Sequence, residues 1–291
     1  MKKEMVKLAP TMPAINPAHF SWVCIGDFKT QNALFNLIVK ANGFVKLAER
    51  IICNSAYELE HATFTTLPEI LPIGPLLASN RLAKQTGYFW KEDPTCLTWL
   101  DQQPAQSVIY VAFGSFTLMD RNQFHELAIG LELTNRPFLW VVRADMVDEM
   151  NNNYLTGYMN RIHERGRIVG WAPQQLVLNH PSVACFVSHC GWNSVLEGVS
   201  SGLPFMCWPY FADQFINQGY VSDVWKTGLE FGKDESGIIS RYEIKNKVEQ
   251  LLEDKECKVR AAELKEKVKI AVRRGGHSDM NLNSFIDWIQ E

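Results

Sequence analysis

The chain has 291 residues, 46% hydrophobic and 21% charged, and these proportions exclude an intrinsically disordered or fibrous protein. Its 29 Lys and Arg are outnumbered by 32 Asp and Glu, so the formal charge of −3 provides no basic surface for nucleic acid or an anionic membrane. No apolar run reaches the roughly 18 residues of a membrane span, so we expect no membrane insertion.

The first hundred residues offer too few elements for a closed core. They contain one amphipathic helix predicted over residues 32–48, one buried strand over residues 50–53 and a Pro-rich run that ends in LPIGPLL. A Rossmann-like domain needs several consecutive βαβ units, and only about one precedes the loop predicted at residues 78–95. We therefore expect residues 1–95 to be the end of a domain whose beginning is absent, together with a linker.

From residue 107 onward, short apolar runs rich in β-branched residues alternate with amphipathic stretches, as in a parallel sheet covered by helices. Strands are predicted over residues 107–113, 138–142, 167–169, 184–188, 204–208 and 229–231. Helices are predicted near residues 120–133, 174–178, 192–200, 213–225, 241–252, 256–274 and 278–289. Asp120 and Gln123 form a predicted capping box at the start of the first of these helices. The fold class is α/β.

The cysteines indicate a reducing compartment. The chain has seven of them, an odd number without a C-x-x-C pair, and several lie in apolar, strand-like stretches where a free thiol behaves as a small hydrophobe. A zinc site has no support in this pattern, nor has secretion, because no Asn-x-Ser/Thr sequon occurs. We expect a cytoplasmic protein.

A strand, a glycine and a helix follow one another at the centre of the stretch from Trp171 to Gln214. The strand FVSHC leads into Gly191, and a helix begins directly after it. Such a junction leaves the first backbone N–H groups of the helix unpaired, at the positive end of its dipole, which makes an anion site. With donors on Asn193 and Ser194, and with His189 within reach, this junction is predicted to hold a diphosphate.

Other side chains of the same stretch suit the rest of a nucleotide sugar. Glu197 can accept hydrogen bonds from vicinal ribose hydroxyls, although a glutamate in a first helical turn is also a common partner of the dipole. Trp171 can stack on a base, although a lone tryptophan more often belongs to the core. Asp213 and Gln214 suit the hydroxyls of a sugar or simply start a helix. A dehydrogenase is excluded because no G-x-G-x-x-G follows any predicted strand.

Taken together, the residues from Trp171 to Gln214 resemble the signature of the family 1 UDP-glycosyltransferases of plants. The resemblance extends through NSAYELE, ILPIGPLLA, CLTWLDQQP and VIYVAFGS, which precede this stretch. It implies a GT-B architecture in which residues 96–277 form a complete C-terminal Rossmann-like donor domain. Residues 1–95 would be the incomplete end of an N-terminal Rossmann-like acceptor domain, and the C-terminal helix at residues 278–291 would pack back toward it.

The resemblance also implies how the donor nucleoside is bound. Trp171 would stack on uracil, and the backbone of Ala172 would bond the base. Gln174 would approach the ribose together with Glu197.

The diphosphate and the sugar have their own residues in this family. His189, Asn193, Ser194 and the N–H groups after Gly191 would hold the diphosphate, with help from Ser115. Reading of the sugar would fall to Trp192, Asp213 and Gln214. A glutamine at the end of the signature favours UDP-glucose as the donor. No metal or other cofactor is expected, because a helix terminus and a histidine can neutralise the leaving UDP.

The family's catalytic base is not found in this sequence. In such enzymes a histidine near the start of the first domain, supported by an aspartate, takes the proton of a small hydroxylated acceptor while the anomeric carbon inverts. Apart from His189, the histidines lie outside such a context: His19, His61, His125, His163, His180 and His277. We expect the base in a missing N-terminal region, and weak or absent transfer. The alternatives are a nucleotide-sugar-binding module that needs a separate N-terminal half, and a truncated product without function.

Overall fold

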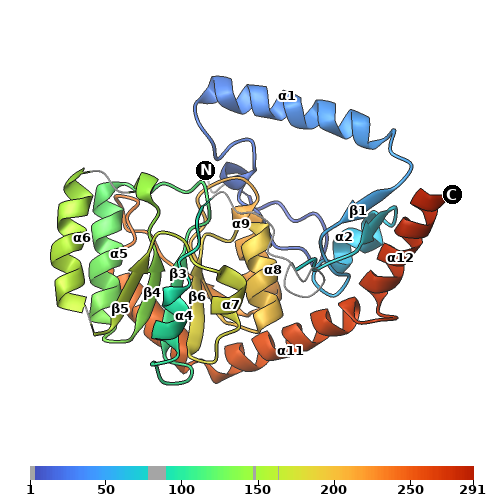
Figure 1. Ribbon diagram of the computed structural model, residues 1–291. Helices are drawn as coiled ribbons and strands as arrows, with labels where there is room; N and C mark the ends of the chain where they lie inside the picture. Colours follow the sequence, from blue (N-terminus) through green and yellow to red (C-terminus); the bar gives the residue numbers. More distant parts are fainter. Residues whose placement is uncertain (1–3, 78–89, 147–148, 163) are drawn as a thin grey trace.

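A parallel sheet of six strands forms the centre of the computed structural model, which describes residues 4–77, 90–146, 149–162 and 164–291 (Figure 1). The strands are β3 (Val108–Ala112), β4 (Phe138–Val141), β5 (Gly166–Val169), β6 (Val183–Ser188), β7 (Phe205–Cys207) and β8 (Gly228–Glu230). The six strands predicted after residue 107 are confirmed, and each bound lies within one residue of the predicted one.

The order of the strands fixes where a ligand can bind. It runs β5-β4-β3-β6-β7-β8, so the chain builds outward from β3 in one direction and then returns to place β6 on the other side of β3. In open parallel sheets of this kind, ligands bind in the crevice outside the carboxyl ends of the two strands at which the direction reverses. The loops that follow β3 and β6 therefore frame the expected site.

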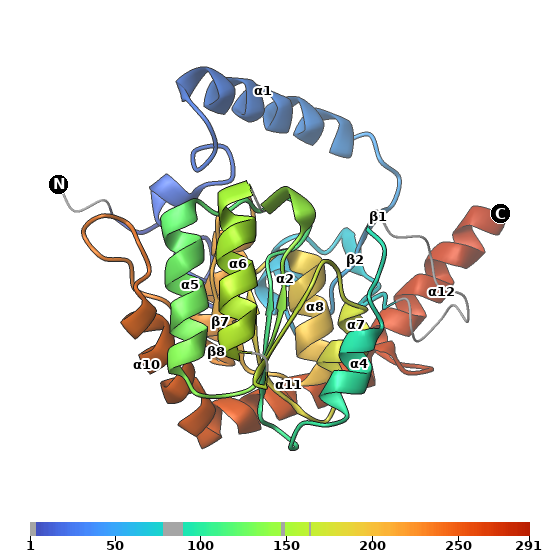
Figure 2. The same ribbon diagram turned by 60° about the vertical axis from the view of Figure 1, so that its left-hand side comes forward.

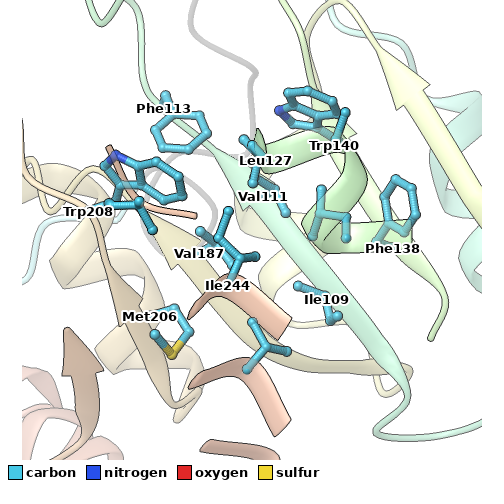
Figure 3. Close-up of a cluster of buried hydrophobic side chains, with 14 of the residues drawn as sticks. Ile109, Val111, Phe113, Leu127, Phe138, Trp140, Val187, Met206, Trp208 and Ile244 are labelled. Carbon is cyan, nitrogen blue, oxygen red and sulfur yellow. The ribbon is translucent and has the colours of Figure 1, made fainter. Parts of the chain in front are cut away.

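Helices cover both faces of the sheet because its strands are apolar on both sides. One face packs against α5 (Arg121–Leu133), α6 (Glu149–Ile162) and α10 (Arg241–Glu253). The other packs against α4 (Thr95–Leu100), α7 (Gln174–Leu178), α8 (Trp192–Ser201) and most of α11 (Lys255–Val272). Ile109 and Val111 point into the first core, which Figure 3 shows, while Val108 and Tyr110 point into the second.

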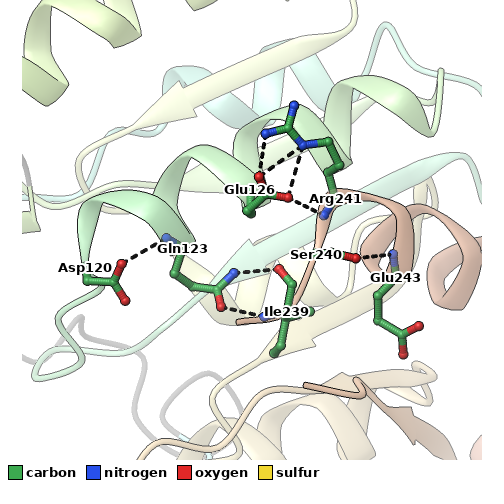
Figure 4. Close-up of polar contacts among 7 residues, drawn as sticks. All are labelled: Asp120, Gln123, Glu126, Ile239, Ser240, Arg241 and Glu243. Carbon is green, nitrogen blue, oxygen red and sulfur yellow. Dashed lines mark hydrogen bonds and ion pairs between the residues drawn. The ribbon is translucent and has the colours of Figure 1, made fainter. Parts of the chain in front are cut away.

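Only one of the two hydrogen bonds of the predicted capping box is present at the start of α5. Asp120 Oδ1 accepts the backbone N–H of Gln123 at 3.0 Å, as predicted. The Gln123 side chain does not return the bond. It donates to the Ile239 carbonyl at 2.8 Å and accepts the Ile239 N–H at 2.9 Å (Figure 4). The buried backbone of Ile239 has no other partner for these two groups in the described chain, so the glutamine satisfies it instead.

Most of the predicted helices are confirmed, and the differences have local causes. The helix predicted over residues 213–225 is divided into α9 (Gln214–Gly219) and the π-helical turn η3 (Tyr220–Val224). The sequence predicted neither α6, whose first turns are polar, nor the six-residue α4. The last helix, α12 (His277–Gln290), extends one residue beyond the predicted range at each end, and its Asn281 Nδ2 donates to the Pro72 carbonyl at 2.8 Å. No helix in the described ranges is both long and apolar enough to cross a membrane.

The N-terminal part forms a small sheet and a helix without buried residues, in which Phe35 contacts the ring of Trp22. It contains η1 (Pro17–His19), α1 (Phe28–Val45), β1 (Ile51–Cys53), α2 (His61–Thr66) and β2 (Ile70–Pro72), with β1 parallel to β2. The predicted helix begins four residues earlier than expected, because Asp27 caps it by accepting the Thr30 N–H. No residue of α1 is buried, and the helix stands apart from the rest of the chain in both views (Figures 1 and 2).

Replacing Gln123 with alanine tests the bond between α5 and the segment before α10. Gln123→Ala leaves both backbone groups of Ile239 buried without a partner, so we expect the free energy of unfolding to fall by about 2–4 kcal/mol. Urea denaturation followed by circular dichroism measures this change. Asn122→Ala, at an exposed position of the same helix, is the matched control. Equal effects of the two substitutions would contradict this interpretation.

Candidate functional site

A cavity of about 360 Å³ lies at the carboxyl ends of β3 and β6, where the strand order places a ligand. Its wall is built by the loops after β3, β5 and β6 and by the first turns of α7 and α8. Every predicted site residue except Asp213 and Gln214 lines it: Ser115, Trp171, Ala172, Gln174, His189, Gly191, Trp192, Asn193, Ser194 and Glu197. Residues as far apart in the sequence as Ser115 and Glu197 thus share one cavity.

The N-terminus of α8 opens into this cavity without a cap. Gly191 is the N-cap residue, and its carbonyl accepts the first helical bond, from the Val195 N–H at 3.0 Å. No side chain caps the helix, and the N–H groups of residues 192–194 have no acceptor among the described residues. These donors, at the positive end of the dipole, make the junction a binding site for an anion.

A left-handed residue sets the direction of this helix. The positive φ falls on Cys190, at 63°, and not on Gly191. Two hydrogen bonds hold the turn: the Cys190 N–H donates to Ser188 Oγ at 3.1 Å, and Asn217 Nδ2 donates to the Cys190 carbonyl at 2.9 Å. A non-glycine residue in this conformation costs about 1–3 kcal/mol, which the surrounding bonds must offset. The sequence did not single out Ser188, Cys190 or Asn217.

His189 is neutral in this environment. Burial, with the nearby Arg143 charge as a second cause, lowers the pKa of His189 to about 4. A Cβ atom on Gly114 would lie 2.6 Å from its Nε2, and one on Gly191 would lie 2.4 Å from it, so the ring fits only between two glycines. Its Nδ1 has no hydrogen-bond partner in the described chain. His189 was expected to help neutralise a diphosphate, but with this pKa it acts at neutral pH as a hydrogen-bond donor without a full charge.

Arg143, which the sequence did not reveal, fixes the loop that carries Ser115. Its guanidinium is fully buried at the end of the FLWVVR stretch and pairs with Asp145 at 2.9 Å. It donates to the Gly114 carbonyl and, at 2.8 Å, to the Thr117 carbonyl. Two carbonyls from one turn are thereby held by one side chain, which orders the loop after β3.

Gln174 is the centre of a network beside the first two turns of α8. Its Nε2 donates to Glu197 Oε2 at 2.6 Å and to Ser194 Oγ at 2.9 Å, and its Oε1 accepts the Tyr110 hydroxyl at 3.1 Å. Gln175 Nε2 donates to the other Glu197 oxygen at 3.0 Å. Burial raises the pKa of Glu197, and the two amide donors partly offset that rise. The carboxylate is therefore held in one orientation with lone pairs still free for hydroxyl donors.

Two of the three residues predicted to read a sugar lie outside the cavity. Gln214 is buried, and its Oε1 accepts the backbone N–H groups of Tyr210 at 2.8 Å and Phe211 at 3.2 Å. Asp213 accepts from the Asn217 amide, within the start of α9. These side chains stabilise the turn before α9, so in this structure the Asp-Gln pair has the second of its two expected roles, which is to start a helix.

The third, Trp192, does line the cavity, but its indole is committed elsewhere. Its Nε1 donates to the Asn54 carbonyl at 2.8 Å. A second indole, that of Trp225, donates to the Leu59 carbonyl at 3.0 Å. The turn between β1 and α2 is thus bonded to α8 and to the residue after η3. Any contact between Trp192 and a ligand falls to its backbone or to its ring.

The sequence analysis missed seven residues of the cavity wall, of which Ala112, Gly114, Val141 and Gln175 lie next to predicted elements or residues and three have larger side chains. Trp90 and Glu92 come from the end of the loop predicted at residues 78–95, and Tyr110 comes from β3. The sequence did contain one signal for Trp90 and Glu92, because they are an aromatic and an acidic residue in a Pro-containing loop before a helix. Most of that loop, residues 78–89, lies outside the described residues.

No described histidine other than His189 lines the cavity. His19 stacks on Phe215 with ring centroids 4.0 Å apart, beside α9. His163 lies outside the described residues. Within the described ranges, no group of three or more His, Cys, Asp or Glu side chains is arranged to hold a metal ion.

The low pKa of His189 makes a prediction for stability. Between pH 6.5 and about 4 the unfolded chain binds a proton at this histidine and the native chain does not, so acid lowers the free energy of unfolding. We expect this histidine to account for about 2 kcal/mol of loss from pH 7 to pH 5. Urea denaturation at both values should show a smaller loss for His189→Gln than for the wild type. His61→Gln, at an exposed histidine, is the control and should behave as the wild type.

Comparisons with known proteins agree on one family. The family model described as UDP-glucoronosyl and UDP-glucosyl transferase matches residues 74–268. UDP-glycosyltransferase 83A1 of Arabidopsis thaliana is 43% identical over 98% of this chain and 60% of its own length. The 7-deoxyloganetic acid glucosyltransferase of Catharanthus roseus is 38% identical over 84% of this chain and 53% of its own.

Solved structures agree with the sequence comparisons. Phytolacca americana UGT2, complexed with UDP-2fluoro-glucose and pterostilbene, superposes with a TM-score of 0.84 at 29% identity and covers 100% of this chain and 65% of its own. Os79 of O. sativa, in complex with UDP, superposes with a TM-score of 0.75 at 32% identity, and the match covers 81% of this chain and 55% of the Os79 chain. The chain thus spans about 55–65% of these solved chains. Because the family model covers most of the sequence and a 43% identical relative aligns over nearly all of it, the chain belongs to the UDP-glucoronosyl and UDP-glucosyl transferase family, with the GT-B fold.

Proposed function

We propose that this chain binds a UDP-sugar and is the donor-binding part of an enzyme that transfers glucose from UDP-glucose to a hydroxyl of a small molecule, with inversion. The observation that carries the proposal is the cavity at the carboxyl ends of β3 and β6. It combines the open N-terminus of α8 with the oriented Glu197 carboxylate of the same helix and with Trp171.

The cavity offers a different chemistry to each part of the donor. The diphosphate would accept from the N–H groups of residues 192–194, the side chains of Asn193, Ser194 and Ser115, and neutral His189. The ribose hydroxyls would donate to Glu197, and uracil would stack on Trp171 and bond the backbone of Ala172. Negative charge grows on UDP as the glycosidic bond breaks, and oriented N–H donors stabilise it without a metal or other cofactor.

The choice of glucose as the sugar and of a hydroxylated small molecule as the acceptor is supported by relatives and not by contacts in the cavity. The Catharanthus roseus relative is named as a glucosyltransferase, and the Phytolacca americana structure holds UDP-2fluoro-glucose and pterostilbene. Gln214 ends the signature as glucose-using members do, but its carboxamide oxygen is engaged by the backbone in this structure. We assign donor binding to residues 96–277 and place acceptor-side contacts in residues 1–95, with residues 278–291 packing beside β2. A cytoplasmic location is part of this proposal.

A second candidate function is a nucleotide-sugar-binding module that a separate N-terminal half completes. The specific observation is α1, where Phe28 and Phe44 are 77% and 71% exposed and no residue is buried. An apolar helix face of this kind is a surface for another protein segment. Transfer activity that appears only when such a half is added would favour the module over the first proposal.

Calorimetric titration of the chain with UDP tests donor binding. We expect saturable binding that Trp171→Ala weakens by about 10- to 100-fold, because stacking of a base on an aromatic ring is worth about 1–3 kcal/mol. The matched control is Trp288→Ala, which removes another partly buried indole, in α12 and away from the cavity. A folded wild-type chain that does not bind UDP would overturn the proposal.

Turnover is expected to be slow for this chain alone. With no described histidine but His189 at the cavity, the acceptor hydroxyl lacks a base, which typically costs 10²- to 10⁴-fold in rate. Release of UDP from UDP-glucose in the presence of a simple phenol measures this, against a full-length member of the family. Turnover equal to that of the full-length enzyme would mean that a described residue supplies the base after all.

A further inference from the structure

A second cavity, of about 290 Å³, adjoins the cavity at the N-terminus of α8, which is called the donor cavity below. Glu197 and Gln175 line both cavities. At this place α11 runs past the C-terminal end of α8 (Figure 1). The wall residues of the second cavity come mainly from α8, from α11 and from the segment after β2, and include Pro75, Leu77, Ser200, Lys265, Val268 and Lys269. None of these side chains takes part in the proposed binding of the donor.

Two lysine side chains of α11 bring positive charge to the second cavity. Lys265 and Lys269 are four residues apart and therefore share one face of the helix. The stem of Lys265 packs on Gly202, where a Cβ atom would lie 2.9 Å from its Cδ, and its Nζ donates to the Ser201 carbonyl at 3.3 Å. Among the described residues no acid pairs with Lys265, whereas Lys269 lies 3.5 Å from Glu266. Lys265 thus keeps ammonium donors for a ligand, and the packing of its stem fixes their place.

A buried hydroxyl and an acid complete the polar part of this wall. Ser200 Oγ is buried and has no hydrogen-bond partner in the part of the chain that the structure describes. Such a group is uncommon in folded proteins and calls for a partner from outside the chain. Glu197 adds a negative charge, but its two oxygens already accept from the Gln174 and Gln175 amides. Because two ammonium groups face one carboxylate that is already bonded, the cavity favours an anion.

Apolar side chains line the rest of the second cavity. Val268 and Val272 come from α11, and Leu77 comes from the segment after β2. Inorganic phosphate would leave these side chains in contact with water, whereas an organic acid buries its own apolar part against them. We propose that this cavity binds a small organic carboxylate, which Lys265 and Ser200 hold while an apolar body the size of an aromatic ring contacts the valines.

Ligand-detected NMR titration of the chain with benzoate tests this site. We expect saturable binding with a Kd of about 1 mM or below, and binding at least about 10-fold weaker for benzamide, which has the same ring without the charge.

Variants of the lysine and the serine locate the carboxylate. Lys265→Met keeps the stem on Gly202 and removes the ammonium group, so it should weaken benzoate binding by about 10- to 100-fold, the size of one charged hydrogen bond. Ser200→Ala leaves α11 unaltered and should weaken it by about 3- to 10-fold. Lys267→Met, at an exposed position of α11 outside the cavity, is the matched control and should bind benzoate as the wild type does.

Titration in the presence of UDP separates this site from the donor cavity. Saturating UDP should change the benzoate affinity by less than about 3-fold, because the two ligands occupy different cavities that share only part of a wall. Displacement of benzoate by UDP would place benzoate in the donor cavity and overturn the inference.

Three further outcomes would overturn it. They are no saturable binding of benzoate, equal affinity for benzoate and benzamide, and unchanged binding by both Lys265→Met and Ser200→Ala. Inorganic phosphate that competes as well as benzoate itself would show that the ligand needs no apolar body. If the wild type does not bind UDP, the proposed function is wrong, while benzamide and the variants still test the second cavity.

Discussion

The turn between β6 and α8 is the constraint on which the rest of the site depends. Its left-handed Cys190 lets the chain leave a buried strand and start a helix whose first N–H groups open into the cavity. That conformation is unfavourable by itself, so it persists because Ser188 and Asn217 bond its two backbone groups. Gly191 and Gly114 then leave room for the His189 ring, which a side chain at either position would displace.

Long-range bonds orient the remaining walls relative to this turn. Arg143 holds the loop after β3 by two carbonyls, and Gln174 joins β3, α7 and α8 through hydrogen bonds to three side chains. Each of these side chains is buried or partly buried and makes two or more hydrogen bonds, so it keeps few rotamers. The geometry of the cavity thus follows from the strand order together with a small number of polar contacts.

The sequence predicted the sheet well because its strands are buried on both faces and read as continuous apolar runs, such as SVIYVAF before Gly114. It also placed the open helix terminus after β6, since the strand–glycine–helix order is local. It could not predict Arg143 or Asn217, whose partners lie 26 to 29 and 27 residues away and carry no local pattern. For the same reason it assigned Gln123 to a local capping bond, although the buried backbone of Ile239, 116 residues away, uses that side chain.

Trp192 occupies two roles at once, since it lines the cavity and its indole holds the Asn54 carbonyl. Asn54 Oδ1 in turn accepts the Leu76 N–H at 2.8 Å, so Asn54 joins the segments that follow β1 and β2 to the first turn of α8. A ligand that binds at the first turn of α8 is therefore coupled to any partner that binds at these two segments. Thermodynamic linkage makes this coupling reciprocal, because each of the two changes the affinity for the other by the same factor.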